Sequence, residues 1–193
     1  PMGNLREFKS GAERADIIIV SHSPSNLSQS EKDAIKSKIA PKDYQKVFFS
    51  YLKYYQTYQV FQEEIYPITP EKDSHILMLT GIANNSKMKD YLSTLCDKVY
   101  ERKFADHHTY SDQDIESVIN TYNDLQAPNK YIVTTEKDLT RLFPFAHLFN
   151  KAGIKLLCLP IKVNFAAEEK SRFNQVIHFF IEKTIEDYLT PEE

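Results

Sequence analysis

The stretch ADIIIVSH, residues 15–22, decides the fold class of this chain. It is a short, continuous apolar run rich in β-branched residues, a pattern typical of a strand buried on both faces of a parallel sheet. The segment after it begins with a capping-box pattern at Ser28 and Glu31, and Pro41 stops the helix that this pattern starts. A buried strand followed directly by a capped helix predicts an α/β protein.

The same alternation continues along the chain. Strands are expected at residues 45–54, 57–62, 75–81, 98–104, 130–135 and 154–161, and helices at 85–96, 111–125, 136–143 and about 168–189. Strands that alternate with helices of this length predict an α/β fold with a mainly parallel sheet and flanking helices, an α/β/α sandwich. Ser111 is the predicted N-cap of the helix at 111–125.

Composition restricts the partners of this chain. It has 193 residues with a net charge of -3, so no overall basic field points to nucleic acid. The two cysteines, Cys96 and Cys158, are far apart and lie in apolar patterns. They predict neither a disulfide framework nor a zinc site, and they fit a reducing compartment. No apolar run approaches the roughly 20 residues that a membrane helix needs.

Polar residues gather where predicted strands end. In open α/β sheets, ligands bind at the carboxyl ends of the strands, in the loops that enter the next helix. Four such loops have distinctive polar content, at residues 21–24, 81–84, 105–108 and 134–138. If the strands are parallel, these loops gather on one rim of a sheet.

The loop at 105–108 carries Asp106, His107 and His108. An aspartate beside a histidine can fix its tautomer and raise its basicity, which suits proton transfer or charge stabilisation. A metal site needs more ligands, and the nearby Asp112 and Asp114 fall in a first helical turn, where acids favour the helix dipole. A polar turn without chemistry is the alternative interpretation.

Two further loops can contact a ligand. Thr135 can cap the helix that follows it, whose free amides can hold a phosphate, and Lys137 can add a point charge. Gly81 allows close backbone approach, with Asn84 beside it. The alternatives are a capped helix with a solvated charge cluster in the first case and a simple strand-to-helix turn in the second.

The glycines exclude a self-sufficient phosphate-binding loop. The chain has four, Gly3, Gly11, Gly81 and Gly153. Neither a GxxxxGK[ST] nor a GxGxxG pattern can be built from them.

Read together and in order, five segments resemble the latter half of the tetraacyldisaccharide 4'-kinase family of the lipid A pathway in Gram-negative bacteria. They are PMGNLRE, RADIIIVSHSP, LTGIANNSKMKDYL, FADHHTYSDQDI and YIVTTEKDLTRL, and the resemblance covers about residues 1–161. It implies a P-loop kinase at the cytoplasmic face of the inner membrane. Such a kinase transfers the γ-phosphoryl group of ATP, with Mg²⁺, to the 4'-hydroxyl of a tetraacyldisaccharide 1-phosphate, and the product is lipid IVA.

The resemblance also implies roles for particular residues. His107 matches the histidine implicated in catalysis, which pairs with an acidic residue of the amino-terminal half and has Asp106 as its support. Arg6 and Glu7 match an Arg-Glu pattern, and an arginine near the cleft suits a substrate phosphate or developing phosphoryl charge. Thr135 and Lys137 belong to the Thr-Glu-Lys-Asp signature, which is structural or lines the cleft.

One segment departs from the family pattern. Ser21 and His22 stand where the family commonly has Thr-Lys, so the contact of this loop with the nucleotide base is not carried over from the family.

The family has two α/β domains joined by a two-stranded linker, with the active site in the cleft between them. Its phosphate-binding loop and acidic metal motif lie in the amino-terminal domain and do not occur in this sequence. By this map, residues 1–55 are a remnant of the nucleotide-binding domain, 56–72 are a linker strand and loop, and 73–193 are a C-terminal α/β domain closed by the last helix. Pro1 stands before Met2, and we expect a carboxy-terminal part that binds no ATP or Mg²⁺ and is inactive alone.

Two other classes of protein remain open at this point. One is a non-catalytic α/β binding or regulatory domain. The other is a metal-dependent phosphoesterase that uses Asp106, His107 and His108.

Overall fold

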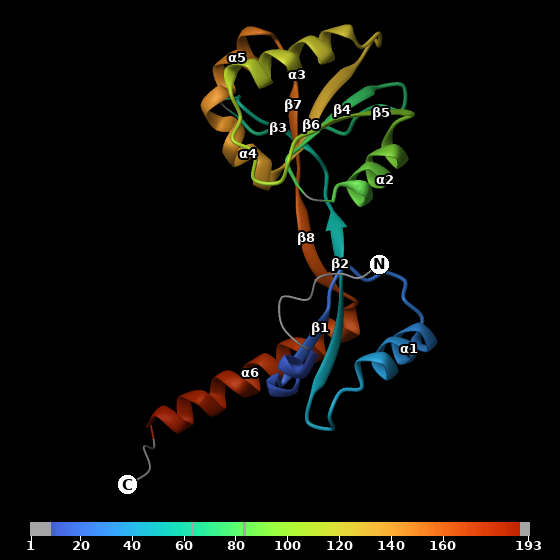
Figure 1. Cartoon of the computed structure of the whole chain (residues 1–193), viewed down its shortest axis with the longest axis vertical. Coiled ribbons are helices and arrows are strands. Elements are labelled where there is room, and N and C mark those ends of the chain that lie inside the picture. The colour runs from blue at the N-terminus through green and yellow to red at the C-terminus, as the bar shows by residue number, and fades with distance from the viewer. Residues whose placement is uncertain (1–8, 63, 83, 190–193) are drawn as a thin grey trace. The chain divides into compact units, whose positions relative to one another are not determined.

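The computed structural model describes residues 9–62, 64–82 and 84–189 (Figure 1). They form two compact units. Unit 1 lies within Pro1–Lys53 and Lys162–Glu193, and unit 2 within Tyr54–Ile161. Within the described residues, no helix is both long and apolar enough to cross a membrane.

Unit 2 is built on a five-stranded sheet. Its strands are β3 (Tyr58–Gln59), β7 (Leu156–Leu159), β6 (Lys130–Thr135), β4 (His75–Thr80) and β5 (Lys98–Lys103), in that order across the sheet. β4 pairs in parallel with β5 and with β6, and β6 pairs in parallel with β7. Only the short β3, at the edge of the described sheet, is antiparallel to its neighbour. The predicted mainly parallel sheet is therefore present in this unit.

Helices cover both faces of this sheet, as Figure 1 shows. They are α2 (Ser86–Leu95), α3 (Asp112–Asp124), α4 (Glu136–Leu142), the 3-10 helix η2 (Phe143–Phe145) and α5 (Ala146–Lys151). Alternate residues of β4 point to opposite faces. Leu77 and Leu79 pack in the core beneath α3, α4 and α5, whereas Ile76 and Met78 pack in the core beneath α2. This two-sided burial makes unit 2 an α/β/α sandwich and confirms the mixed α/β class.

Unit 1 contains a second, smaller sheet. β1 (Ile17–Val20), β2 (Lys46–Tyr54) and β8 (Ile161–Phe165) are its described strands, and β1 pairs in parallel with β2. The 3-10 helix η1 (Lys9–Arg14) and the helices α1 (Gln29–Ile39) and α6 (Ala167–Leu189) complete the unit.

The last helix, α6, packs within unit 1. The Phe173 ring meets Phe48 edge to face at 5.2 Å between centroids and stacks on Phe165 at 4.8 Å. Glu169 accepts a hydrogen bond from the backbone amide of Phe49 at 2.7 Å. The sequence placed this helix with residues 73–193. The observed grouping differs because the partners of its apolar stripe come from β2 and β8.

Sequence signals that involve only a few neighbouring residues are confirmed. Ser28 and Ser111 both close full capping boxes, on α1 and α3. The strand expected at 154–161 is instead two strands, β7 and β8, because Pro160 lies between them and has no amide hydrogen for a ladder. β1 was expected to be buried on both faces, yet Ile19 is 46% exposed, because β1 lies at an edge of the described sheet.

Leu77→Ala should destabilise unit 2 by about 2–5 kcal/mol, because the side chain is fully buried and its removal leaves a cavity beneath α3 and α4. Urea unfolding of the chain, followed by circular dichroism, measures this change in the free energy of unfolding. Ile65→Ala is the matched control: Ile65 is 72% exposed, so its removal should cost within about 0.5 kcal/mol. Equal losses for the two variants would contradict the assigned core.

Candidate active site

Three of the four polar loops lie at one edge of the unit 2 sheet. β4, β5 and β6 are mutually parallel, so the loops that follow them, 81–84, 105–108 and the start of α4, share the carboxyl edge of the sheet. The fourth loop, 21–24, follows β1 in the sheet of unit 1. The sequence-based expectation of one rim therefore holds for three loops, and Ser21 and His22 lie outside this edge.

Asp138 links the loop at 81–84 to the start of α4. Its carboxyl group is fully buried, and Oδ2 accepts hydrogen bonds from the Gly81 amide at 3.1 Å and from the Thr135 hydroxyl at 3.0 Å. The Thr135 Oγ1 in turn accepts from the Asp138 amide and caps α4. A Cβ atom at Gly81 would lie 3.2 Å from both Asp138 Oδ1 and the Tyr110 hydroxyl. Gly81 and Thr135 therefore hold the edge together, and their contacts are with protein groups.

Asp106 is held by Lys137. Lys137 Nζ donates to Asp106 Oδ1 at 3.2 Å, and the His107 amide donates to the same oxygen at 3.1 Å. The hydrogen bond from Lys137 lowers the pKa of Asp106, with smaller contributions from the charges of His107 and Lys137. Asp106 is therefore a carboxylate at neutral pH, beside a histidine and a lysine.

His107 sits at the tip of this turn. Its φ of 62° is in the left-handed region, which a residue other than glycine seldom adopts. The side chain is 74% exposed; its Nε2 lies 3.7 Å from Asp106 Oδ2, and its Nδ1 lies 3.2 Å from Arg141 Nη2. The predicted Asp106–His107 pair is thus present, and the ring stands at the surface where a second group can reach it.

His108 has different partners from His107. Its Nε2 lies 3.1 Å from Asp114 Oδ2, and its ring stacks on Phe104 at 4.7 Å between centroids. Asp114 also closes the capping box of α3. These contacts give His108 a structural role in the turn. A pocket of about 320 Å³ opens beside it, lined by residues 107–110, Arg141, Pro144 and Phe145.

Asn84 lies at the start of α2. Its Oδ1 accepts from the Ser86 amide at 3.0 Å and from the Ser86 hydroxyl at 2.8 Å. The carbonyl end of this side chain is therefore occupied by the first turn of the helix. Arg6 and Glu7, the two other predicted cleft residues, lie outside the described residues.

Arg141 is the residue that the sequence reasoning missed. It lies three residues after Asp138 and four after Lys137 on α4, so the three side chains leave neighbouring parts of one helical face. Arg141 Nη1 is 3.6 Å from Asp138 Oδ1, while its Nη2 reaches His107. The i, i+3 spacing to a buried acid is the sequence signal that points to it.

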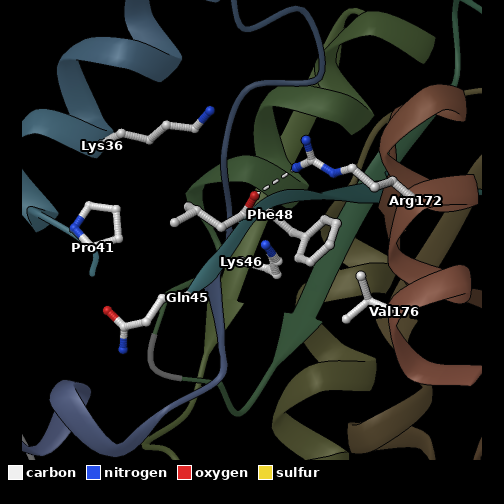
Figure 2. A pocket seen from close by; sticks show the side chains of 8 residues that line it. Lys36, Pro41, Gln45, Lys46, Phe48, Arg172 and Val176 are labelled. Atoms are coloured by element: carbon white, nitrogen blue, oxygen red, sulfur yellow. Dashed lines mark hydrogen bonds between the residues drawn. The ribbon is translucent and has the colours of Figure 1, made fainter. Parts of the chain in front are cut away.

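Unit 1 carries a separate hollow of about 400 Å³, seen in Figure 2. Its lining combines three cationic side chains with apolar ones, among them Lys36, Lys46, Arg172, Phe48 and Val176. Arg172 donates to the backbone carbonyl of Val47 at 2.9 Å, the dashed line in Figure 2, and its guanidinium lies 4.8 Å from the centroid of the Phe48 ring. None of the described site residues lines this hollow, so it is distinct from the edge described above.

Comparison with known proteins gives the chain a family. The family model of tetraacyldisaccharide-1-P 4'-kinase, LpxK, matches residues 1–179. A tetraacyldisaccharide 4'-kinase of Flavobacterium johnsoniae is 35% identical over 186 residues, which are 96% of this chain and 51% of that protein. The chain belongs to the tetraacyldisaccharide 4'-kinase family. The resemblance seen in the sequence is therefore confirmed at the level of the family.

Other matches to tetraacyldisaccharide 4'-kinases have the same extent. The protein of that name from Bacteroides thetaiotaomicron is 31% identical over 92% of this chain and 49% of its own length. The chain thus spans about half the length of the curated relatives it matches. A crystal structure of LpxK from Aquifex aeolicus in complex with ATP aligns with 92% of this chain and 46% of that chain, at a TM-score of 0.49 and 21% identity.

In this member of the family, Lys137→Met should raise the pKa of Asp106 towards its ordinary value, because the hydrogen bond that favours the carboxylate is lost. The folded pKa of Asp106 is depressed. Its contribution to stability is therefore present above the unfolded pKa, about 3.9, and is lost as pH falls through the folded pKa. The stability difference between wild type and variant should accordingly be complete at neutral pH and disappear in acid.

A carbon-detected NMR titration of the Asp106 carboxyl measures the shift. Lys89→Met is the control, since it removes a cation that pairs with Glu101 instead. If the Asp106 midpoint were the same in wild type and Lys137→Met, the pairing would be refuted.

Proposed function

We propose that this chain is the carboxy-terminal part of an ATP-dependent kinase that phosphorylates the 4'-hydroxyl of tetraacyldisaccharide 1-phosphate to give lipid IVA. The family match supports the class of reaction. The observation that carries the proposal to this chain is the Asp106–His107 pair on the carboxyl edge of a parallel sheet, with Lys137 and Arg141 beside it.

The site suits the electrostatics of phosphoryl transfer. Catalysis of this reaction is mostly positioning together with stabilisation of the charge on the transferred group. Arg141 brings one cationic group to the exposed His107 ring, and Lys137 brings a second to the neighbouring Asp106, which compensates part of that charge. In the proposed kinase, His107 orients the group that accepts the proton of the acceptor hydroxyl, and Asp106, which is held by Lys137, adds a negative charge beside the ring.

ATP and Mg²⁺ belong, in this proposal, to the longer enzyme. The 193 residues cannot form a glycine-rich phosphate-binding loop from their four glycines. Among the side chains that the structure describes, no three His, Cys, Asp or Glu residues gather as a metal site. We therefore assign the magnesium nucleotide to the longer enzyme and derive no step through it from the described residues.

Unit 1 supports a division between two domains of a P-loop kinase. β1 is an apolar strand at the edge of the described sheet, with Ile19 46% exposed. A strand of this composition is typical of a sheet interior. Residues 1–55, as a remnant of the nucleotide-binding domain, would find their missing neighbours in the rest of that domain. Residues 56–72, expected from the sequence as the linker, fall within unit 2, where Tyr58–Gln59 form the edge strand β3.

The proposed acceptor also bears on where the longer enzyme would work. A tetraacylated disaccharide is held in a bilayer by its acyl chains, so a kinase that acts on its sugar works at the interface. We propose the cytoplasmic face of the inner membrane, where ATP is available, as the location of the longer enzyme.

The isolated chain should show no ATP-dependent phosphorylation of the tetraacyldisaccharide 1-phosphate. The phosphate-binding loop and the metal-binding motif, on which catalysis of this reaction mainly depends, are absent from its sequence. Thin-layer separation of radiolabelled product measures this. The full-length Flavobacterium johnsoniae relative serves as the positive control. Robust turnover by the 193 residues alone would contradict the proposal that another part of the longer enzyme binds ATP and Mg²⁺.

In a longer enzyme that contains these residues, His107→Ala should lower kcat by roughly 10²- to 10⁴-fold, the usual contribution of a side chain that manages a proton. ATP affinity should change little, since His107 lies in unit 2 and the phosphate-binding loop is proposed to lie outside this chain. Steady-state kinetics and nucleotide titration separate the two effects. His178→Ala, at an exposed position of α6, is the control, and an unchanged kcat for His107→Ala would reduce His107 to a turn residue.

A further inference from the structure

We infer that Arg141 is a positioning residue that holds His107 as a hydrogen-bond donor through its Nε2–H. The catalytic consequence of this inference rests on the proposed function, whereas the contact itself does not. The inference depends on three features of α4 and the His107 turn: the chemistry of the guanidinium, the place left for the ring proton, and the buried anchor of Arg141.

The guanidinium fixes the tautomer of His107. Arg141 Nη2 lies 3.2 Å from His107 Nδ1. Arginine has donors only and stays protonated in proteins, so the imidazole nitrogen must accept. An accepting Nδ1 carries a lone pair and no hydrogen, and the proton of the neutral ring is therefore on Nε2.

No group in residues 9–62, 64–82 or 84–189 accepts a hydrogen bond from Nε2–H. Among the described residues, the carboxylate oxygen that faces Nε2 is Asp106 Oδ2, and it is 3.7 Å away, which is longer than a hydrogen bond to a ring nitrogen. Asp106 is itself held by Lys137 Nζ and by the His107 amide. Since the ring is 74% exposed, its Nε2–H can be donated to an approaching acceptor, such as a carboxylate that takes the hydroxyl proton. The Nδ1 lone pair, which a general base would use, is occupied by Arg141.

The anchor of Arg141 makes this arrangement more than a chance surface contact. Arg141 Nη1 lies 3.6 Å from Oδ1 of Asp138, a fully buried carboxyl group that also accepts from the Gly81 amide and the Thr135 hydroxyl. Only 24% of the Arg141 side chain is exposed. Buried charges are retained when they are paired and hydrogen-bonded. The position of the exposed ring is thus set, through one guanidinium, by the ends of β4 and β6.

α4 therefore fixes the turn from two sides. Lys137 and Arg141 are one helical turn apart, so they leave the same face of the helix. Lys137 binds the aspartate of the turn and Arg141 binds its histidine. The left-handed backbone of His107, with a φ of 62°, is held between these two contacts.

The first test uses this chain and needs no kinase activity. Histidine-labelled protein is studied by long-range proton–nitrogen correlation at alkaline pH, where imidazoles are neutral. The chain has six histidines, and His107→Gln identifies the signal of His107 by its loss. We expect Nε2 to be protonated, with Nδ1 unprotonated and displaced by the hydrogen bond that it accepts.

Arg141→Met should abolish the displacement of Nδ1 and bring the two nitrogen shifts towards the average of interconverting tautomers. Because this change leaves Asp138 buried without its cation, the double variant Asp138→Asn, Arg141→Met removes both charges and keeps the side-chain shapes. Lys89→Met is the control and should leave the His107 signals unchanged. Identical His107 signals in wild type and both Arg141 variants, or a protonated Nδ1 in wild type, would overturn the inference.

The second test uses the longer kinase and separates a donor from a base. His107→Gln keeps an N–H donor near the position of Nε2, so it should retain at least roughly tenfold more kcat than His107→Ala, within the range that a positioned proton-bearing group contributes. Arg141→Met should lower kcat roughly tenfold to a hundredfold with little change in KM for ATP, because it misplaces the ring without touching the nucleotide. Arg141→Lys should recover part of the loss, since an ammonium group also donates.

Equal kcat values for His107→Gln and His107→Ala would overturn the donor role. An unchanged kcat for Arg141→Met would overturn the positioning role. Failure of the proposed function is recognised separately, because the wild-type longer enzyme would then form no 4'-phosphorylated product at all.

Discussion

The buried carboxyl group of Asp138 is the constraint on which the candidate site depends. It accepts from the Gly81 amide at the end of β4 and from the Thr135 hydroxyl at the end of β6, and it faces the guanidinium of Arg141. Burying a carboxylate is costly unless its charge is paired. Here Oδ2 accepts both hydrogen bonds, and Oδ1, which has no hydrogen-bond partner among the described residues, lies 3.6 Å from the Arg141 cation. Removing one partner from a buried ion pair typically costs roughly 3–5 kcal/mol, so the ends of these strands are fixed relative to α4.

Side chains of α4 connect the buried edge of the sheet to the exposed turn that carries His107. α4 presents Lys137 and Arg141 on one face, and these two side chains hold Asp106 and His107 of the loop that follows β5. A rigid sheet edge thus positions a histidine that is itself exposed. The ring is open to contact at the surface, and the Arg141 guanidinium beneath it restricts its tautomer.

Much of the candidate site was predictable because its signals are local. Asp106 and His107 are adjacent in the sequence, and strand-to-helix loops on parallel strands must share an edge. Arg141 was not predicted, because its role depends on a contact with a residue 34 positions away. The capping role of Thr135 was predicted, but the hydrogen bond from Gly81 to the same Asp138 carboxyl group was not, since the Gly81 amide lies 57 residues from that group. Asn84, expected in the cleft, is instead engaged by the first turn of α2.

The sequence by itself determined the α/β class, the order of strands and helices, and the capped starts of α1 and α3, since periodicity and capping act over a few residues. Tertiary structure decided which strands and helices pack against one another. It grouped α6 with β2 and β8 through Phe173, Phe48 and Phe165, placed β1 at the edge of the described sheet, and separated β7 from β8 at Pro160. Apolar stripes specify that a surface will be buried, but the hydrophobic effect has no direction. The partner is therefore chosen by chain connectivity and by packing, which no short segment contains.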